Sequence, residues 1–173
     1  GRAMTHEPVK QTLRLGIAGL GTVGASVVQM IARRADALEA AIGAPIRVTA
    51  VSARDRHRDR GVDLSGLTWF DDPVALATAS EVDCVVELIG GADGAAKAVV
   101  EAAIGTGKHV VTANKALLAR HGAALARAAE ARGVALAYEA SVAGGIPVIK
   151  ALREGLAGNA VSRVYGILNG TCN

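Results

Sequence analysis

The fold of this chain is decided by one stretch, LRLGIAGLGTVG at residues 13–24. Its first six residues are mostly apolar, as in a buried strand, and Gly19, Gly21 and Gly24 follow where a helical pattern begins. At such a strand-to-helix corner, the first glycine allows a tight turn, the second lets the backbone approach a pyrophosphate, and the third lets helix and strand pack closely. The helix N-terminus adds amides that bind phosphate. We therefore predict a dinucleotide-binding corner in preference to a purely structural turn.

The rest of the chain repeats the strand-to-helix alternation. Short β-branched runs alternate with Ala-rich stretches of helical period, and residues 84–89 are almost continuously apolar, as expected when helices cover both faces of a sheet. This pattern predicts an α/β fold, a doubly wound parallel sheet of the Rossmann type. We expect strands at residues 13–18, 46–52, 83–88, 109–112, 134–138 and 161–168. We expect helices at residues 22–41, 73–79, 94–106, 115–132 and 147–156, and a surface loop at residues 54–66.

Composition narrows the class of protein. The chain has 173 residues, enough for one domain, and 51% of them are hydrophobic although only 2% are aromatic. This disfavours disorder and the stacking of nucleic-acid bases on aromatic rings. The net charge of +3 is spread along the chain except for the arginines of residues 54–60, so a local phosphate site is open but a general polyanion partner is weakly supported.

Cysteine and histidine spacing argues against several kinds of site. Cys84 and Cys172 stand in unrelated contexts, and the four histidines show no metal-ligand spacing. Cys84 lies in an apolar strand, which predicts a packed thiol, and the cysteine usage fits a reducing cytoplasm. Residues 1–12 form a polar tail, whose first three residues we interpret as a tag remnant, and neither a signal peptide nor a membrane span is expected.

The end of the second expected strand bears on cofactor choice. An acidic side chain there would bind the adenosine ribose of NAD, but the chain continues with Ser52, Ala53 and Arg54. Arg54 can bind a 2′-phosphate by charge-assisted hydrogen bonds, which favours NADP. Glu39 does not take the role of this acidic residue, because it lies within the first expected helix. Asp55 could still bind the ribose, so NAD stays open as the alternative cofactor.

Two further strand ends should face the same crevice. Residues 88–91 end in two glycines, against whose backbone a nicotinamide ring can lie. At the next strand end, Asn114 is a candidate N-cap, which puts Lys115 in the first helical turn, where the helix dipole repels a cation by about 0.3–1 kcal/mol. That position indicates either a functional amine or a surface lysine that tolerates the penalty.

Residues 138–147, which include Glu139, form either a cation site or a buried turn.

Four blocks of this sequence, in order, resemble the homoserine dehydrogenase family. They are VELIGG at residues 86–91, VVTANKAL at residues 110–117, residues 138–147, and GILNGTCN at residues 166–173. The resemblance runs from Leu15 to Asn173. It implies a Rossmann domain at residues 13–145, after the tail at residues 1–12, followed at residues 146–173 by the truncated start of a substrate and dimerisation domain.

The resemblance also implies an activity and its partners. The family interconverts L-homoserine and L-aspartate 4-semialdehyde with NAD(P), in the biosynthesis of threonine, methionine and isoleucine. We expect a small-molecule substrate, a homo-oligomeric full-length enzyme, and neither a nucleic acid nor a membrane as partner. Because the chain stops where the substrate domain begins, we expect it to bind cofactor with little or no turnover.

Site residues follow from the resemblance by position. The residues implied to contact the cofactor, beyond the glycines of the corner, are Leu20, Thr22, Val23, Arg54, Gly90, Ala113 and Lys115. Lys115 is also implied as the catalytic group that assists charge and proton changes at the reacting carbon. The residues implied to hold a monovalent cation, sodium, are Glu139, Val142, Gly144 and Ile146. The residues implied to border the substrate are Asn169, Gly170 and Thr171.

Two other functions compete with this one. Another NADP-linked reductase of small molecules, such as a semialdehyde dehydrogenase, would need a reactive cysteine at a strand end, which Cys84 does not provide. A non-catalytic nucleotide-binding module would need only the corner at residues 19–24. Titration with NADPH and NADH, together with an assay of homoserine oxidation, separates the three functions.

Overall fold

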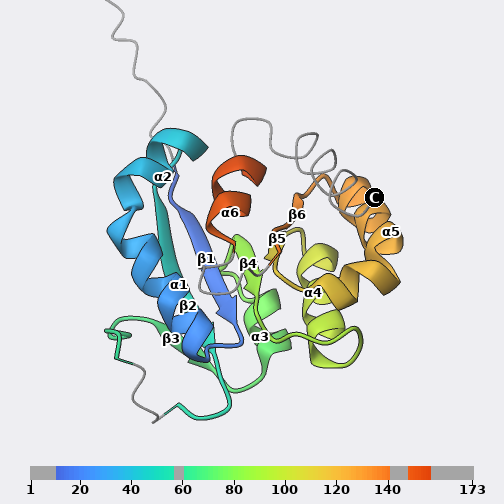
Figure 1. The fold of residues 1–173 in the computed structure, drawn as a ribbon, viewed down its shortest axis with the longest axis horizontal. Helices are drawn as coiled ribbons and strands as arrows, with labels where there is room; N and C mark the ends of the chain where they lie inside the picture. Colours follow the sequence, from blue (N-terminus) through green and yellow to red (C-terminus); the bar gives the residue numbers. More distant parts are fainter. Residues whose placement is uncertain (1–10, 57–60, 141–147, 157–173) are drawn as a thin grey trace, which may run out of the picture.

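A computed structural model describes residues 11–56, 61–140 and 148–156 of the chain. Its centre is a six-stranded sheet in the order β3-β2-β1-β4-β5-β6, in which every neighbouring pair is parallel (Figure 1). The strands are β1 Leu13–Ala18, β2 Ile46–Ser52, β3 Thr68–Phe70, β4 Cys84–Glu87, β5 His109–Thr112 and β6 Leu136–Tyr138. This order is that of a doubly wound Rossmann sheet, so the predicted fold class is confirmed.

Helices cover both faces of the sheet. They are α1 Thr22–Arg33, α2 Ala35–Ile42, α3 Pro73–Thr78, α4 Ala95–Gly105, α5 Lys115–Arg132 and α6 Ile149–Gly155. Helices α1, α2 and α6 pack against one another, and α4 packs between α3 and α5 (Figure 1). This division is the one that right-handed crossovers require when the chain moves outward from β1 in both directions. The central strands are consequently buried on both sides, and all four residues of β4 are inaccessible to solvent.

The structure confirms most of the expected elements and corrects two. Strands β1, β2 and β5 and helix α5 have the predicted bounds, and the other expected elements in the described ranges differ by one or two residues at an end. The predicted helix at residues 22–41 is wrong, because the backbone leaves the helical region at Arg34 (φ −106°, ψ 19°) and divides it into α1 and α2. Strand β3 was not expected. The strand expected at residues 161–168 lies outside the described residues.

Two helix N-caps can be followed in the structure, one of them the predicted cap at Asn114. The Asp72 carboxylate accepts a 2.9 Å hydrogen bond from the Val74 amide and caps α3, which begins with proline. The Asn114 side chain accepts a 3.0 Å bond from the Leu117 amide and caps α5. Because both caps are set by the sequence itself, α3 and α5 begin at fixed points beside the carboxyl edge of the sheet.

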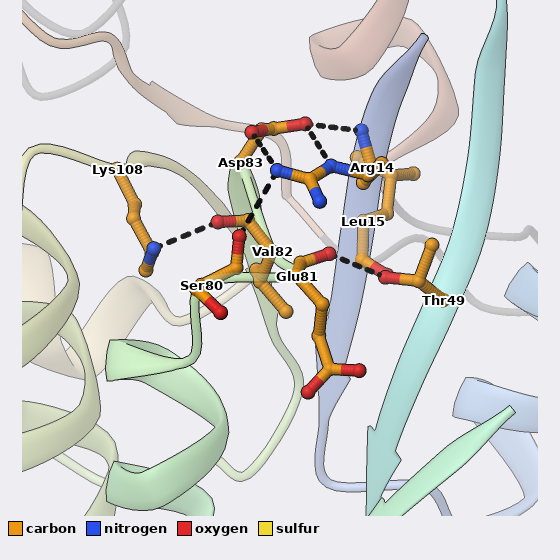
Figure 2. A network of polar contacts seen from close by, with 8 residues as sticks. All are labelled: Arg14, Leu15, Thr49, Ser80, Glu81, Val82, Asp83 and Lys108. Atoms are coloured by element: carbon orange, nitrogen blue, oxygen red, sulfur yellow. Dashed lines mark hydrogen bonds and ion pairs between the residues drawn. The ribbon is translucent and has the colours of Figure 1, made fainter.

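Polar side chains tie together the amino-terminal edge of the sheet (Figure 2). The Arg14 guanidinium on β1 binds both Asp83 oxygens at 2.9 Å, and these hydrogen bonds hold the pKa of Asp83 below its ordinary value. The Lys108 amine donates a 2.8 Å bond to the Val82 carbonyl, and burial lowers the pKa of this amine. The Thr49 hydroxyl on β2 donates to the Glu81 carbonyl at 2.9 Å. This edge is therefore held by side chains that bind one another and nearby backbone.

In the part of the chain that the structure describes, no helix is both long and apolar enough to cross a bilayer.

Candidate functional site

A cavity of about 590 Å³ opens at the carboxyl-terminal edge of the sheet. Its walls come from the segments that follow β1, β2 and β4 and from the starts of α3 and α4. The residues that line it are Gly19, Leu20, Gly21, Ser52, Ala53, Arg54, Asp55, Asp71, Pro73, Leu88, Ile89 and Ala95. This is the switch point of the sheet, where connections leave β1 and β4 in opposite directions, and its volume suits a small-molecule ligand.

The first glycine of the corner is required by the protein itself. Gly19 has φ +99°, and a Cβ there would stand 2.9 Å from the backbone atoms Leu88 C and Ile89 N. The amides of Gly19 and Leu20 both donate to the Ser52 carbonyl, at 3.0 and 2.9 Å. The turn after β1 is thereby fixed between the ends of β2 and β4, which sets the rear of the cavity.

The second glycine leaves room for a ligand. Gly21 lines the cavity and precedes α1, and a Cβ added to it would meet no protein atom within 4 Å. Its φ of −99° also suits any residue, so protein packing does not explain a glycine here. Helix α1 has no side-chain cap and no acidic residue in its first turn. Its first amides have no acceptor within the helix, so this corner fits the pyrophosphate of a dinucleotide.

The end of β2 supplies charge to the cavity. Ser52 is buried there, and the exposed Arg54 and Asp55 follow it on the cavity wall, which Asp71 from the segment before α3 also lines. The neighbouring Arg56 instead lies over the Trp69 ring, 6.0 Å from its centroid. One cation and two carboxylates thus border this end of the cavity. Glu39 lies in α2 and is not one of the lining residues, in agreement with the sequence analysis.

A fully buried carboxylate organises the end of β4. Glu87 is 0% exposed, and its Oε2 accepts hydrogen bonds from the amides of Ile89 and Gly90, at 2.7 and 2.9 Å. Its Oε1 accepts a 2.6 Å bond from the Thr112 hydroxyl on β5. Because the parallel register pairs Glu87 with Thr112, the two side chains meet at the ends of their strands.

The same hydrogen-bond network continues to the start of α5. The Thr112 hydroxyl oxygen accepts a 3.0 Å bond from the Asn114 amide, and the Asn114 side-chain nitrogen donates a 2.7 Å bond to the Gly91 carbonyl. Lys115 follows as the first residue of α5 and is exposed, and Ala113 is half-buried. The segment after β4 and the start of α5 are therefore bound to each other at this edge.

The structure places the predicted cofactor residues in two groups. Those that line the cavity are Gly19, Leu20, Gly21 and Arg54. Those that are not among its lining residues are Thr22, Val23, Gly24, Gly90, Ala113 and Lys115. Within the second group, Val23 is 49% exposed on the first turn of α1, and Gly24 is buried, where a Cβ would stand 3.0 Å from the Gly19 oxygen. The two groups share the carboxyl edge of the sheet.

The predicted cation and substrate residues are largely outside the described ranges. Those outside are Val142, Gly144, Ile146, Asn169, Gly170 and Thr171. Glu139 is half-buried after β6, and its carboxylate accepts a 3.1 Å bond from the Lys150 amide at the start of α6. Among residues 11–56, 61–140 and 148–156, no group of three His, Cys, Asp or Glu side chains could hold a metal ion.

Cys84 is a packed thiol, as expected. It is fully buried in β4, and burial raises the pKa of its thiol. A thiol in this state does not act as a nucleophile, which argues against cysteine-based semialdehyde chemistry.

Sequence reasoning missed two parts of the site. It did not place Asp71, Pro73 and Ala95 at the cavity, because they reach it only through the packing of α3 and α4 on the sheet. It also passed over Glu87. The signal was present, since a glutamate at the end of a buried apolar strand costs free energy unless several donors bind it.

Known proteins resemble this chain over most of its length. Residues 19–139 match the family model described as homoserine dehydrogenase, NAD binding domain, and residues 147–173 match the one described as homoserine dehydrogenase. A homoserine dehydrogenase of Mycobacterium leprae is 46% identical over 164 residues, which cover 95% of this chain and 36% of that protein. One from Neisseria gonorrhoeae is 44% identical over 161 residues, 93% of this chain and 37% of that protein.

A solved structure from the same family is also similar to this chain. The crystal structure of a homoserine dehydrogenase from Thiobacillus denitrificans matches with a TM-score of 0.71 and 43% identity, over 85% of this chain and 34% of that one. The chain thus spans about a third of the length of the relatives that it matches.

Proposed function

This chain belongs to the homoserine dehydrogenase family, and we propose that it is the NAD(P)-binding part of an enzyme that interconverts L-homoserine and L-aspartate 4-semialdehyde. That reaction is an oxidoreduction at a CH–OH group, on the route to threonine, methionine and isoleucine. The observation that carries the proposal is the cavity at the switch point, whose wall includes Gly21 directly before the uncapped first turn of α1.

The residues of the cavity fit the three parts of a dinucleotide. The diphosphate would bind the first amides of α1, beside Gly21, where a ligand can reach the backbone without meeting a side chain. The adenosine ribose would lie at the end of β2, and the nicotinamide half would lie along Leu88 and Ile89. Hydride transfer is the chemistry that the bound nicotinamide supplies, so the role of these residues is to hold and orient it.

For the adenosine end we propose a preference for NADP over NAD. Arg54 lies on the cavity wall beside the buried Ser52, and a guanidinium there can bind a 2′-phosphate through two parallel hydrogen bonds. Asp55 and Asp71, which also line the cavity, are the groups that would favour NAD, because a carboxylate binds the ribose hydroxyls and repels a phosphate.

Lys115 is the residue that we propose to act on the substrate. Its position as the first residue of α5 puts an exposed amine at the carboxyl edge of the sheet, close in sequence to the Asn114 cap. A cation at this point would stabilise negative charge that develops on the substrate oxygen. In the enzyme with its substrate domain, Lys115→Ala is expected to lower kcat more than it lowers cofactor affinity.

Several further features of the proposal rest on the resemblance. We place the domain boundary between residues 145 and 146, which the two family matches, ending at 139 and beginning at 147, support. The sodium site of Glu139, Val142, Gly144 and Ile146, the substrate border of Asn169, Gly170 and Thr171, and a homo-oligomeric enzyme remain proposals. The free, buried Cys84 supports a reducing compartment, the cytoplasm.

Calorimetric titration of this chain with NADPH and NADH tests the proposed function. Binding of either nucleotide is expected, with NADPH the tighter ligand, and homoserine oxidation by this chain is expected to be little or none. The same titration and assay on the chain extended by its substrate domain should give both binding and turnover. Absence of binding of both nucleotides to both proteins would contradict the proposal, and binding without turnover in both would favour a non-catalytic module.

A further inference from the structure

We propose that Glu87 is a positioning residue for the nicotinamide half of the cofactor. The inference rests on the proposed function and deepens it, because it assigns a role to a side chain outside the cavity. Glu87 is 0% exposed and is not a lining residue, so it acts through the groups that it binds.

The burial of Glu87 costs free energy. It ends the apolar strand β4, and burial of a carboxylate in such surroundings is tolerated only where hydrogen bonds replace water. Three donors do so, two backbone amides and one hydroxyl, and no buried side-chain polar atom is left without a partner in the described part of the chain. A stable apolar strand would not need this group, which points to a role for the segments that it holds.

One segment held by Glu87 is the cavity wall after β4. Ile89, whose amide binds the carboxylate, lines the cavity together with Leu88. Gly90 and Gly91 follow with φ of +85° and +88°. Consecutive glycines have wide conformational freedom, so this turn depends on outside contacts to keep one shape. The carboxylate supplies two of them within three residues of its own position.

The other segment held by Glu87 is the start of α5. The Thr112 hydroxyl donates to the carboxylate and at the same time accepts from the Asn114 amide. The Asn114 side chain caps α5 and binds the Gly91 carbonyl, which closes a ring of hydrogen bonds back to the glycine turn. The carboxylate and the Asn114 side chain together therefore tie residues 88–91, which we call the nicotinamide wall, to the helix that begins with Lys115.

This arrangement predicts which half of the cofactor depends on Glu87. The diphosphate corner takes its hydrogen bonds from β2, through the Gly19 and Leu20 amides on the Ser52 carbonyl, and none from the carboxylate. Loss of the network should therefore loosen the nicotinamide wall and leave the binding of the adenosine half unchanged. Substitution of a residue needed only for folding would weaken the binding of both halves equally.

Two ligands separate these outcomes in calorimetric titrations of this chain. NADPH engages both halves of the cavity, and 2′-phospho-ADP-ribose lacks the nicotinamide ring. Glu87→Gln preserves shape but loses an acceptor, and it is expected to weaken NADPH binding about tenfold or more while 2′-phospho-ADP-ribose binding changes less than about twofold. Thr112→Val, which removes the hydroxyl, should behave alike, and Thr112→Ser, which restores it, should bind NADPH as the unaltered chain does.

The controls keep this inference distinct from the proposed function. If the unaltered chain binds neither NADPH nor NADH, the proposed function itself fails. If it binds NADPH, and Glu87→Gln and Thr112→Val weaken both ligands equally or weaken neither, the inference about Glu87 is overturned. Melting curves identify unfolded variants, and failure of both Glu87→Gln and Thr112→Val to fold would make the network a folding element and also overturn the inference.

Discussion

The two edges of the same sheet both carry polar networks, but they differ in what those networks hold. At the amino edge, Arg14 and Asp83 form an ion pair whose side chains are 36% and 35% exposed. At the carboxyl edge, Glu87 is fully buried and binds backbone amides that shape a cavity. At the amino edge the side chains bind one another and nearby backbone. At the carboxyl edge the network holds backbone that lines the cavity, where a ligand can bind.

The difference shows which polar groups indicate a functional site. A half-exposed pair keeps much of its hydration, so its removal has a small effect and its presence needs no functional reason. A buried carboxylate with three neutral donors is far harder to replace, and it is kept where its geometry matters. We therefore expect substitutions at the carboxyl edge to alter ligand binding or folding strongly, and substitutions at the amino edge to alter stability slightly.

The largest expected effect is at Gly19. Gly19→Ala forces a side chain into a positive φ and puts its Cβ 2.9 Å from the backbone of residues 88 and 89, so it should lower the free energy of unfolding by about 3 kcal/mol or more. Gly43→Ala is the matched control, because Gly43 also has a positive φ but a Cβ there meets nothing within 4 Å, and it should cost about 1–2 kcal/mol. Urea unfolding measures both values, and equal losses would contradict the close packing of this corner.

The next effect is mainly on binding, at Gly21. A methyl group at Gly21 meets no protein atom but should occupy the path of the pyrophosphate, so Gly21→Ala should weaken NADPH binding about tenfold or more and lower the melting temperature only slightly, because alanine is a poorer N-cap than glycine. Gly105→Ala, at the far end of α4, adds a methyl group with equally open surroundings and should leave NADPH affinity unchanged. Titration calorimetry decides the matter, and unaltered affinity in Gly21→Ala would place the ligand elsewhere.

A smaller and more selective effect is expected at Arg54. Arg54→Ala should weaken NADPH binding about tenfold, because it removes charge-assisted bonds to the 2′-phosphate, and should change NADH binding by less than about twofold. Arg56→Ala removes an arginine two residues away that lies over Trp69 and not on the cavity wall, and it serves as the control. Equal weakening of both nucleotides by Arg54→Ala would contradict the proposed preference for NADP.

Local patterns in the sequence predict part of this fold and miss the parts that leave no local pattern. Strands β1 and β2 have their predicted bounds because apolar periodicity acts locally. Helix α5 has them because the Asn114 cap starts it and Gly133, with φ +67°, ends it. Strand β3 is a three-residue edge strand, too short to show a period. The break at Arg34 leaves the apolar spacing of Ile31 and Leu38 undisturbed, so the pattern does not reveal it.

The candidate site was predictable to a similar extent. The corner at residues 19–24 and Arg54 follow from local spacing. The network of Glu87 does not, because its link to Thr112 spans 25 positions in the sequence and depends on the register between β4 and β5. A buried glutamate in the sequence indicates that partners exist, but only the sheet identifies them.

The smallest expected effect is at Asp83, on the amino edge. Hydrogen bonds from Arg14 lower the pKa of Asp83 below the ordinary value of 3.8, so the folded chain favours the ionised form. The stability that this gives is present above pH 3.8 and is lost as the pH falls through the lowered pKa. Asp83→Asn should therefore lower the melting temperature by about 2–4 °C near pH 7, and the difference should shrink on acidification below the ordinary pKa. NADPH affinity should not change, since Asp83 lies at the opposite edge from the cavity, and a loss of affinity without loss of stability would break the division between the two edges.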